Sequence, residues 1–291
     1  MTDPPAAPDL EWLAIERRQA PLLLSFPHSG TAIPADIEAR CVSPWLARKD
    51  TDWWVDRLYA FARDLDASIV RTSISRTVID VNRPPTDAAL YPGRATTGLV
   101  PATTFDGEPL WRQGAAPDAA EIGQRKALYF APFHDALAGE IERLRALHPV
   151  VVLCDCHAIR SVIPRLFPGE LPVLSIGTNG GLSCDLDLAE PIAAVACASP
   201  YATVVDGRFK GGFITRAYGQ PQDGVHAVQI EIAFRGFLRE PVGSVSEASW
   251  PPPFDARFAA PLEQVLREIL GCCLAFAREA AGGSRPPHPA R

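Results

Sequence analysis

An apolar run that ends abruptly in polar residues is the feature that most constrains the fold. Residues 150–153 are Val-Val-Val-Leu, and Asp155, Cys156 and His157 follow almost at once. In a chain that alternates strands and helices, such a run predicts a buried parallel strand. Side chains at the carboxyl ends of such strands line the crevice in which α/β proteins bind ligands. We therefore expect His157 to lie where the chemistry takes place.

Strands and helices alternate along the rest of the chain. Further strands are predicted at residues 22–26, 67–72, 77–81, 173–177, 201–205 and 227–232. Helices are predicted from about residue 51, on either side of a break near Pro132, and at residues 187–198 and 255–280. This alternation predicts an α/β fold whose mainly parallel sheet is covered on both faces. We expect one catalytic domain at 21–280, between a mobile lead-in at 1–20 and a loose tail at 281–291.

Composition excludes several classes of protein. The chain has 291 residues, of which 47% are hydrophobic, so it can bury a sizeable core. A formal net charge of -6 without a basic patch argues against a nucleic-acid partner. No apolar stretch reaches the roughly 18 residues that a membrane span needs. Seven cysteines in apolar contexts, together with an acidic, proline-rich start, predict a reduced cytoplasmic protein. The sequence gives no signal for the oligomeric state.

Two histidines directly follow predicted strands, with only Pro27 between the first strand and His28. Singly, His28 or His157 could be a polar residue that caps a turn. Two imidazoles that converge with a carboxylate would instead form a three-ligand zinc site with one open position. The sequence leaves the carboxylate open, and its candidates are Asp50, Asp52 and Asp56.

Three further polar residues are candidates for this site. Asp155 faces the same side of its strand as His157, so it could orient that imidazole or serve as a structural acid. Glu231 lies inside a core-like strand, where a carboxylate is costly unless it is used or paired. It is the candidate general base, and the alternative is a buried salt bridge. His226, five residues earlier, is a candidate third imidazole.

Arginine side chains point to an acidic substrate. Arg83 follows Asn82 at a predicted strand end, and its planar guanidinium can bind a carboxylate through two hydrogen bonds. Other basic residues could add to this anion pocket or simply face solvent, namely Arg76, Arg208, Lys210 and Arg216. The long segment 84–116 is rich in Pro, Gly and Thr, which predicts a functional loop such as a lid or a pocket wall.

Other catalytic schemes lack their motifs. The chain has no Gly-x-Ser-x-Gly elbow, no phosphate-binding Gly-x-x-x-x-Gly-Lys loop and no Gly-x-Gly-x-x-Gly after a strand. A thiol nucleophile is also disfavoured, since Cys156 and His157 are neighbours in a strand and point to opposite faces.

Taken together, six short motifs resemble the N-formylglutamate amidohydrolase family. They are Pro-His-Ser-Gly at 27–30, Asp-Thr-Asp-Trp at 50–53, residues 75–83 with their closing Asn-Arg, Asp-Cys-His at 155–157, residues 207–212, and Gln-Ile-Glu at 229–231. The resemblance covers about residues 20–275 in order. It implies hydrolysis of N-formyl-L-glutamate to formate and L-glutamate, a step of histidine degradation.

The motif order is also similar to that of zinc carboxypeptidases and aspartoacylases. That similarity implies a three-layer αβα sandwich with a mostly parallel, mixed sheet. One difference is that Thr31 stands where a His-x-x-Glu motif would place its glutamate. The third metal ligand must then come from elsewhere, and we expect Asp52, with Asp50 as the second choice.

The resemblance implies a role for each candidate residue. A single divalent ion, zinc first among metals that share such ligands, is held by His28, Asp52 and His157. Glu231 acts as the base, with Asp155, Asp50 and His226 less certain. The substrate carboxylates are held by Asn82, Arg83, Arg76, Arg216 and Arg208. Two alternatives remain: a hydrolase of another N-acyl acidic amino acid, and a metal-free dicarboxylate-binding protein on the same fold.

Overall fold

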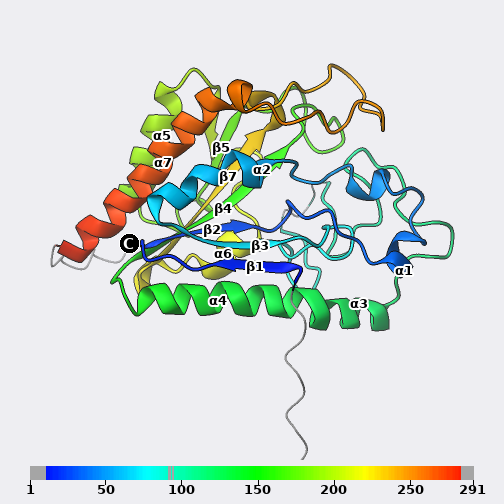
Figure 1. The fold of residues 1–291 in the computed structure, drawn as a ribbon, viewed down its shortest axis with the longest axis horizontal. Coiled ribbons are helices and arrows are strands. Elements are labelled where there is room, and N and C mark those ends of the chain that lie inside the picture. The colour runs from blue at the N-terminus through cyan, green and yellow to red at the C-terminus, as the bar shows by residue number, and fades with distance from the viewer. Residues whose placement is uncertain (1–10, 91–92, 94, 283–291) are drawn as a thin grey trace, which may run out of the picture.

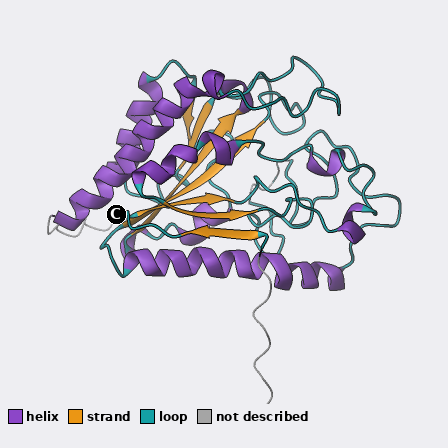
Figure 2. Cartoon of the chain, in the orientation of Figure 1, coloured by secondary structure: helices purple, strands orange, loops and turns teal. Residues whose placement is uncertain are grey.

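A seven-stranded mixed sheet lies between two layers of helices (Figures 1 and 2). The computed structural model describes residues 11–90, 93 and 95–282. The strands are β1 Leu13–Glu16, β2 Leu22–Phe26, β3 Ser68–Thr72, β4 Val151–Ile159, β5 Leu174–Gly177, β6 Thr203–Val205 and β7 Val225–Ala233. The α-helices are α1 Ala35–Glu38, α2 Val55–Leu58, α3 Ala119–Arg125, α4 Ala131–Arg145, α5 Leu186–Ala198, α6 Phe213–Tyr218 and α7 Ala256–Gly282.

The sheet order is β1-β3-β2-β4-β7-β5-β6. Four neighbouring strands, β3, β2, β4 and β7, are parallel to one another. The edge strand β1 runs antiparallel to β3, whereas on the other side β5 runs antiparallel to β7 and parallel to the edge strand β6. The predicted α/β sandwich with a mostly parallel, mixed sheet is therefore confirmed.

Alternation along β4 divides the core between the two faces of the sheet. Cys154 and Cys156 pack in the cluster that contains α5 and α7, whereas Val151 and Leu153 pack in the cluster that contains α4. Because side chains alternate along a strand, the face of β4 that carries Leu153 continues to Asp155 and His157. The site therefore lies on the α4 face of the sheet, at the carboxyl ends of its inner strands.

Three predictions of local structure are wrong. The first strand, β1, falls in the segment that we expected to be a mobile lead-in, and it pairs with β3. Residues 77–81 form no strand, because the buried Asp80 accepts hydrogen bonds from His28, Arg76 and the Asn82 N–H and so turns the chain. The long helix from residue 51 is replaced by α2 and a 3-10 helix, Ala60–Leu65, after Trp54 adopts a φ of 62°.

Other boundaries agree with the sequence pattern. Pro132 lies in the first turn of α4, where proline is tolerated, and a π-helical segment at Lys126–Phe130 joins α3 to α4. Residues 84–116 contain only isolated bridges and turns where they are described.

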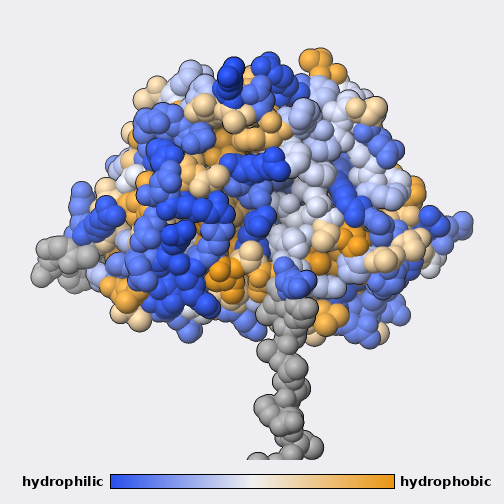
Figure 3. All heavy atoms as spheres, viewed as in Figure 1, coloured by the Kyte–Doolittle hydropathy of each residue, from blue (hydrophilic) through white to orange (hydrophobic). Residues whose placement is uncertain are grey.

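Residues 1–10 and 283–291, which we predicted to be loose, lie outside the described part of the chain. Within that described part, no helix combines the length and the apolar character needed to cross a bilayer. Polar residues cover much of the face seen in Figure 3.

Candidate metal centre and active site

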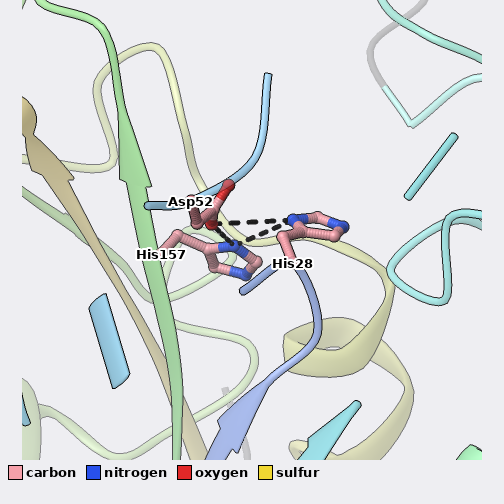
Figure 4. A group of neighbouring side chains, drawn as sticks. All are labelled: His28, Asp52 and His157. Carbon is pink, nitrogen blue, oxygen red and sulfur yellow. Dashed lines mark hydrogen bonds and ion pairs between the residues drawn. The ribbon is translucent and has the colours of Figure 1, made fainter. Parts of the chain in front are cut away.

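Three buried side chains bring one ligand atom each to a common point (Figure 4). His28 follows β2, Asp52 lies in the loop before α2, and His157 lies near the end of β4. Nδ1 of His157 lies 3.2 Å from Nδ1 of His28 and 3.0 Å from Oδ2 of Asp52. Nδ1 of His28 lies 3.8 Å from the same oxygen. Ligands about 2.0 Å from a tetrahedral zinc ion stand about 3.3 Å apart, so these separations fit a shared ion.

Backbone hydrogen bonds hold Asp52 against both histidine-bearing segments. The Asp52 N–H donates to the carbonyl of His28 at 3.0 Å. The Ala158 N–H donates to Oδ2 of Asp52 at 3.1 Å. The carboxylate is thus fixed to the strand that carries His157 and to the loop that carries His28, without any regular helix around it.

Each imidazole is oriented by a buried carboxylate on its far side. Nε2 of His28 lies 2.6 Å from Oδ1 of Asp80, and Nε2 of His157 lies 3.0 Å from Oδ2 of Asp155. When Nε2 donates to a carboxylate, Nδ1 is left with the lone pair that a metal needs. Both rings therefore turn the same nitrogen toward the shared point, as a metal site requires.

The charges of this centre shift the pKa values of its acids and bases. Burial alone would raise the pKa of Asp80, but the charges of His28 and Arg76 outweigh it and hold that pKa well below its usual range. Burial, with Arg76 next, lowers the pKa of His28. For His157, burial is outweighed by Asp155 and Asp52, and its pKa lies well above the ordinary value.

Glu231 lies beside the metal centre on the neighbouring strand. It is the register partner of His157 in the parallel pair β4–β7, so both side chains are on the same face of the sheet. Burial raises the pKa of Glu231 to about 7, with the charge of Asp52 adding to the rise and that of His157 opposing it. Nε2 of Gln229 donates to Oε2 of Glu231 at 3.2 Å. The carboxyl can therefore exchange a proton near neutral pH.

A cavity of about 70 Å³ opens onto these groups. It is lined by the three ligand residues, by Glu231, and by Arg76, Asn82, Arg83 and Arg208. Arg76 donates to Oδ2 of Asp80 at 2.7 Å, and its other terminal nitrogen lies 3.7 Å from Oδ1 of Asp52. Three arginines and two carboxylates line this cavity, so the charged groups of its lining carry a net positive charge even without a metal ion.

Comparison with known proteins identifies the family. The model of the N-formylglutamate amidohydrolase family matches residues 20–238. An N-formylglutamate deformylase of Pseudomonas aeruginosa is 45% identical over 270 residues, which are 92% of this chain and 98% of that protein. One of Pseudomonas putida is 43% identical over 270 residues, covering 92% of this chain and 97% of that protein. The chain belongs to the N-formylglutamate amidohydrolase family.

Solved structures support the family fold. A crystal structure of N-formylglutamate amidohydrolase from Ralstonia eutropha has a TM-score of 0.73 and 22% identity, and covers 92% of this chain and 97% of that one. A gene product of Agrobacterium tumefaciens has a TM-score of 0.61 and 21% identity, and covers 91% and 96%. At such identities these two structures bear on the architecture alone.

Three of the expected site residues of this amidohydrolase lie apart from the metal centre. His226 is at the other end of β7, where its Nδ1 accepts from the Asp185 N–H and its ring packs on Phe276, so it is no third imidazole. Asp50 accepts from the Phe105 N–H at 2.6 Å and is not among the cavity residues. Arg216, on α6, donates to the Gly211 carbonyl and does not line the cavity.

Asp155 holds the position that alternation predicts, in contact with His157. Asp80 and Gln229 were missed, although both belong to the motifs that mark the amidohydrolase family. The available signal was the same one that marked Glu231, a polar side chain within an apolar run. Asp80 interrupts Val-Ile-Asp-Val at 78–81, and Gln229 shares the face of β7 that carries Glu231.

Proposed function

We propose that this chain is an N-formylglutamate deformylase that hydrolyses N-formyl-L-glutamate to formate and L-glutamate with one divalent metal ion. The observation that carries the proposal is the pairing of a three-atom ligand set with a buried carboxyl whose pKa is about 7. The 45% identity to a deformylase over nearly the whole of both chains supports the choice of substrate.

His28, Asp52 and His157 would hold the ion. Two imidazole nitrogens and one carboxylate oxygen form a donor set typical of catalytic zinc, and cobalt and iron accept the same ligands. When bound, the ion supplies Lewis-acid polarisation of the formyl carbonyl and makes water more acidic. The buried carboxylates of Asp80 and Asp155 support this site by facing Nε2 of each ring, which leaves Nδ1 as the nitrogen available to the ion.

Glu231 moves the proton in this mechanism. Its carboxylate takes a proton from the water that attacks the formyl carbon, and it then delivers that proton to the leaving amine nitrogen as the C–N bond breaks. A base with a pKa near the working pH can perform both transfers. Gln229 keeps the carboxylate in place through the hydrogen bond to Oε2.

The arginines bind charge at the two ends of the substrate. Arg76 stands beside Asp52 and is placed to stabilise the oxygen that gains negative charge as water adds to the formyl carbon. Arg83 and Arg208 line the cavity toward the loop at 95–97, where Arg83 bonds Thr97 and Arg208 bonds the Ala95 carbonyl. We assign these two arginines to the carboxylates of the glutamate part, because guanidinium groups match carboxylates in shape and charge.

Formate release tests the proposal directly. Purified protein loaded with zinc should release formate from N-formyl-L-glutamate and do so far more slowly from N-formyl-L-glutamine, which lacks the side-chain charge. Acetate release from N-acetyl-L-glutamate is measured in parallel. The proposal fails if zinc-loaded protein binds N-formylglutamate but releases no formate, or if N-acetylglutamate is the better substrate.

We also infer a cytoplasmic location, since free cysteines suit a reducing compartment.

A further inference from the structure

One aromatic side chain of the long loop reaches the metal end of the cavity. Phe105 lies in a hairpin-like turn, closed by a bridge between Thr103 and Pro109 and by a bond from the Thr104 N–H to the Glu108 carbonyl at 2.8 Å. Although the loop lacks regular structure, the ring is only 7% exposed and lines the cavity. The loop therefore contributes a wall to the active site, as its composition predicted.

The contacts of Phe105 place its ring next to the reacting end of the substrate. Its centroid lies 4.9 Å from Cζ of Arg76, and Arg76 in turn lies 3.7 Å from the ligand Asp52. The ring also packs in one cluster with Ile159, which follows His157 by two residues on β4 and shares its face. Phe105 thus borders the space beside the ligand atoms.

A second phenylalanine of the same cavity, Phe209, packs against the same apolar cluster as Phe105 but contacts a different arginine. The ring of Phe209 lies 5.0 Å from Cζ of Arg208 and packs edge-on against Phe167. Arg208 also lines a wider neighbouring cavity of about 590 Å³. Phe209 therefore belongs to the outer, carboxylate-binding end, and Phe105 to the inner end.

Buried charges keep Phe105 in position. Its N–H donates to Asp50 at 2.6 Å, and Arg160 contacts both Asp50 and Asp106 at 3.3 and 2.7 Å. Lys49, 4% exposed, lies 2.6 Å from Asp106. Removing one member of such a buried group leaves the others unpaired, so the turn resists displacement. These ion pairs oppose a shift of the loop that would make room for a larger substrate.

We propose that Phe105 sets the upper size limit for the acyl group, so that the site accepts a formyl group and rejects an acetyl group. This inference rests on the proposed function. With the carboxylates at Arg83 and Arg208 and the carbonyl at the ligand atoms, the acyl substituent points to the inner wall. A hydrogen fits between the carbonyl carbon and the ring, whereas a methyl group meets the ring of Phe105.

Steady-state kinetics of two variants test the size limit. The ratio of kcat/KM for N-formylglutamate to kcat/KM for N-acetylglutamate is measured for the wild type, Phe105→Ala and Phe209→Ala. One methyl group in an apolar pocket is worth about 10- to 200-fold in specificity, so Phe105→Ala should lower the ratio by about that factor through a gain with N-acetylglutamate. Phe209→Ala, the matched control, should leave the ratio unchanged even if both KM values rise.

An unchanged ratio in Phe105→Ala, with zinc content and melting temperature close to those of the wild type, would overturn the inference. If Phe105→Ala does not fold, Phe105→Leu provides the test, with a smaller drop in the ratio expected and an unchanged ratio again contradicting the proposal. Calorimetric Kd values for both ligands separate the two proposals. If wild type releases no formate, the proposed function fails, while tighter binding of N-acetylglutamate to Phe105→Ala would still support the size limit.

Discussion

Metal binding should expel protons from this site. Asp155 and Asp52 outweigh burial and hold the pKa of His157 well above its ordinary value, which favours the protonated ring, whereas burial lowers the pKa of His28 and favours its neutral ring. Burial raises the pKa of Glu231 to about 7, so about half of these carboxyls carry a proton at that pH. A divalent ion displaces protons from its ligand atoms and repels the proton on Glu231, so Glu231 should contribute about 0.5 of a proton to the number released per ion at pH 7.

Calorimetry can count these protons. Zinc is titrated into chelator-treated protein at pH 7 in buffers of different ionisation enthalpy, and the slope of observed enthalpy against buffer enthalpy gives the number released. The Glu231→Gln variant should release about 0.5 of a proton less per ion than the wild type at pH 7, and wild-type affinity for zinc should fall as the pH drops below 7. Release of no proton, or equal release by both proteins, would refute the assigned protonation states of His157 and Glu231.

Substitutions at three positions separate the roles of the remaining residues. Glu231→Gln should retain zinc but lower kcat about a hundredfold or more, since it removes the acid–base group, and a normal kcat would exclude Glu231 as the base. Asp80→Asn should weaken zinc binding about 10- to 100-fold, measured by competition with a chelator, and an unchanged affinity would deny Asp80 its orienting role. Arg83→Ala should raise KM for N-formylglutamate about tenfold or more with kcat little changed, because a charge-assisted bond is worth about 1.5–3 kcal/mol, and Arg83→Lys should recover only part of this.

The central strands and their polar ends could be predicted from the sequence for a physical reason. A strand buried on both faces must be apolar on both, so each polar residue in such a run stands out. This reasoning located His157 and Glu231, although no spacing in the sequence shows that they are register partners. The same reasoning applies to Asp80, which interrupts the apolar run at 78–81, although that segment forms a turn and not the predicted strand.

The third candidate ligand could not be derived from periodicity. Asp50, Asp52 and Asp56 all precede or begin a predicted helix, but Asp50 and Asp52 precede the short helix α2 and Trp54 between them and Asp56 has a positive φ, so no repeat fixes where each side chain points. In the structure Asp50 turns to the Phe105 N–H and Asp56 pairs with Arg71 at 2.8 Å. Only tertiary contacts, such as the bond from Asp52 N–H to His28, single out Asp52.

The Asn82–Arg83 pair combines the two requirements of the site. The Asn82 N–H donates to Asp80 at 2.9 Å, and its side-chain nitrogen donates to Asp155 at 3.0 Å, so this residue contacts both carboxylates that orient the imidazoles. A Cβ on Gly212 would lie 2.5 Å from that side-chain nitrogen, which explains a glycine there. The same side-chain nitrogen also lies 2.9 Å from Nε2 of His157. These contacts support a positioning role for Asn82 and leave the binding of substrate charge, as proposed, to Arg83 beside it.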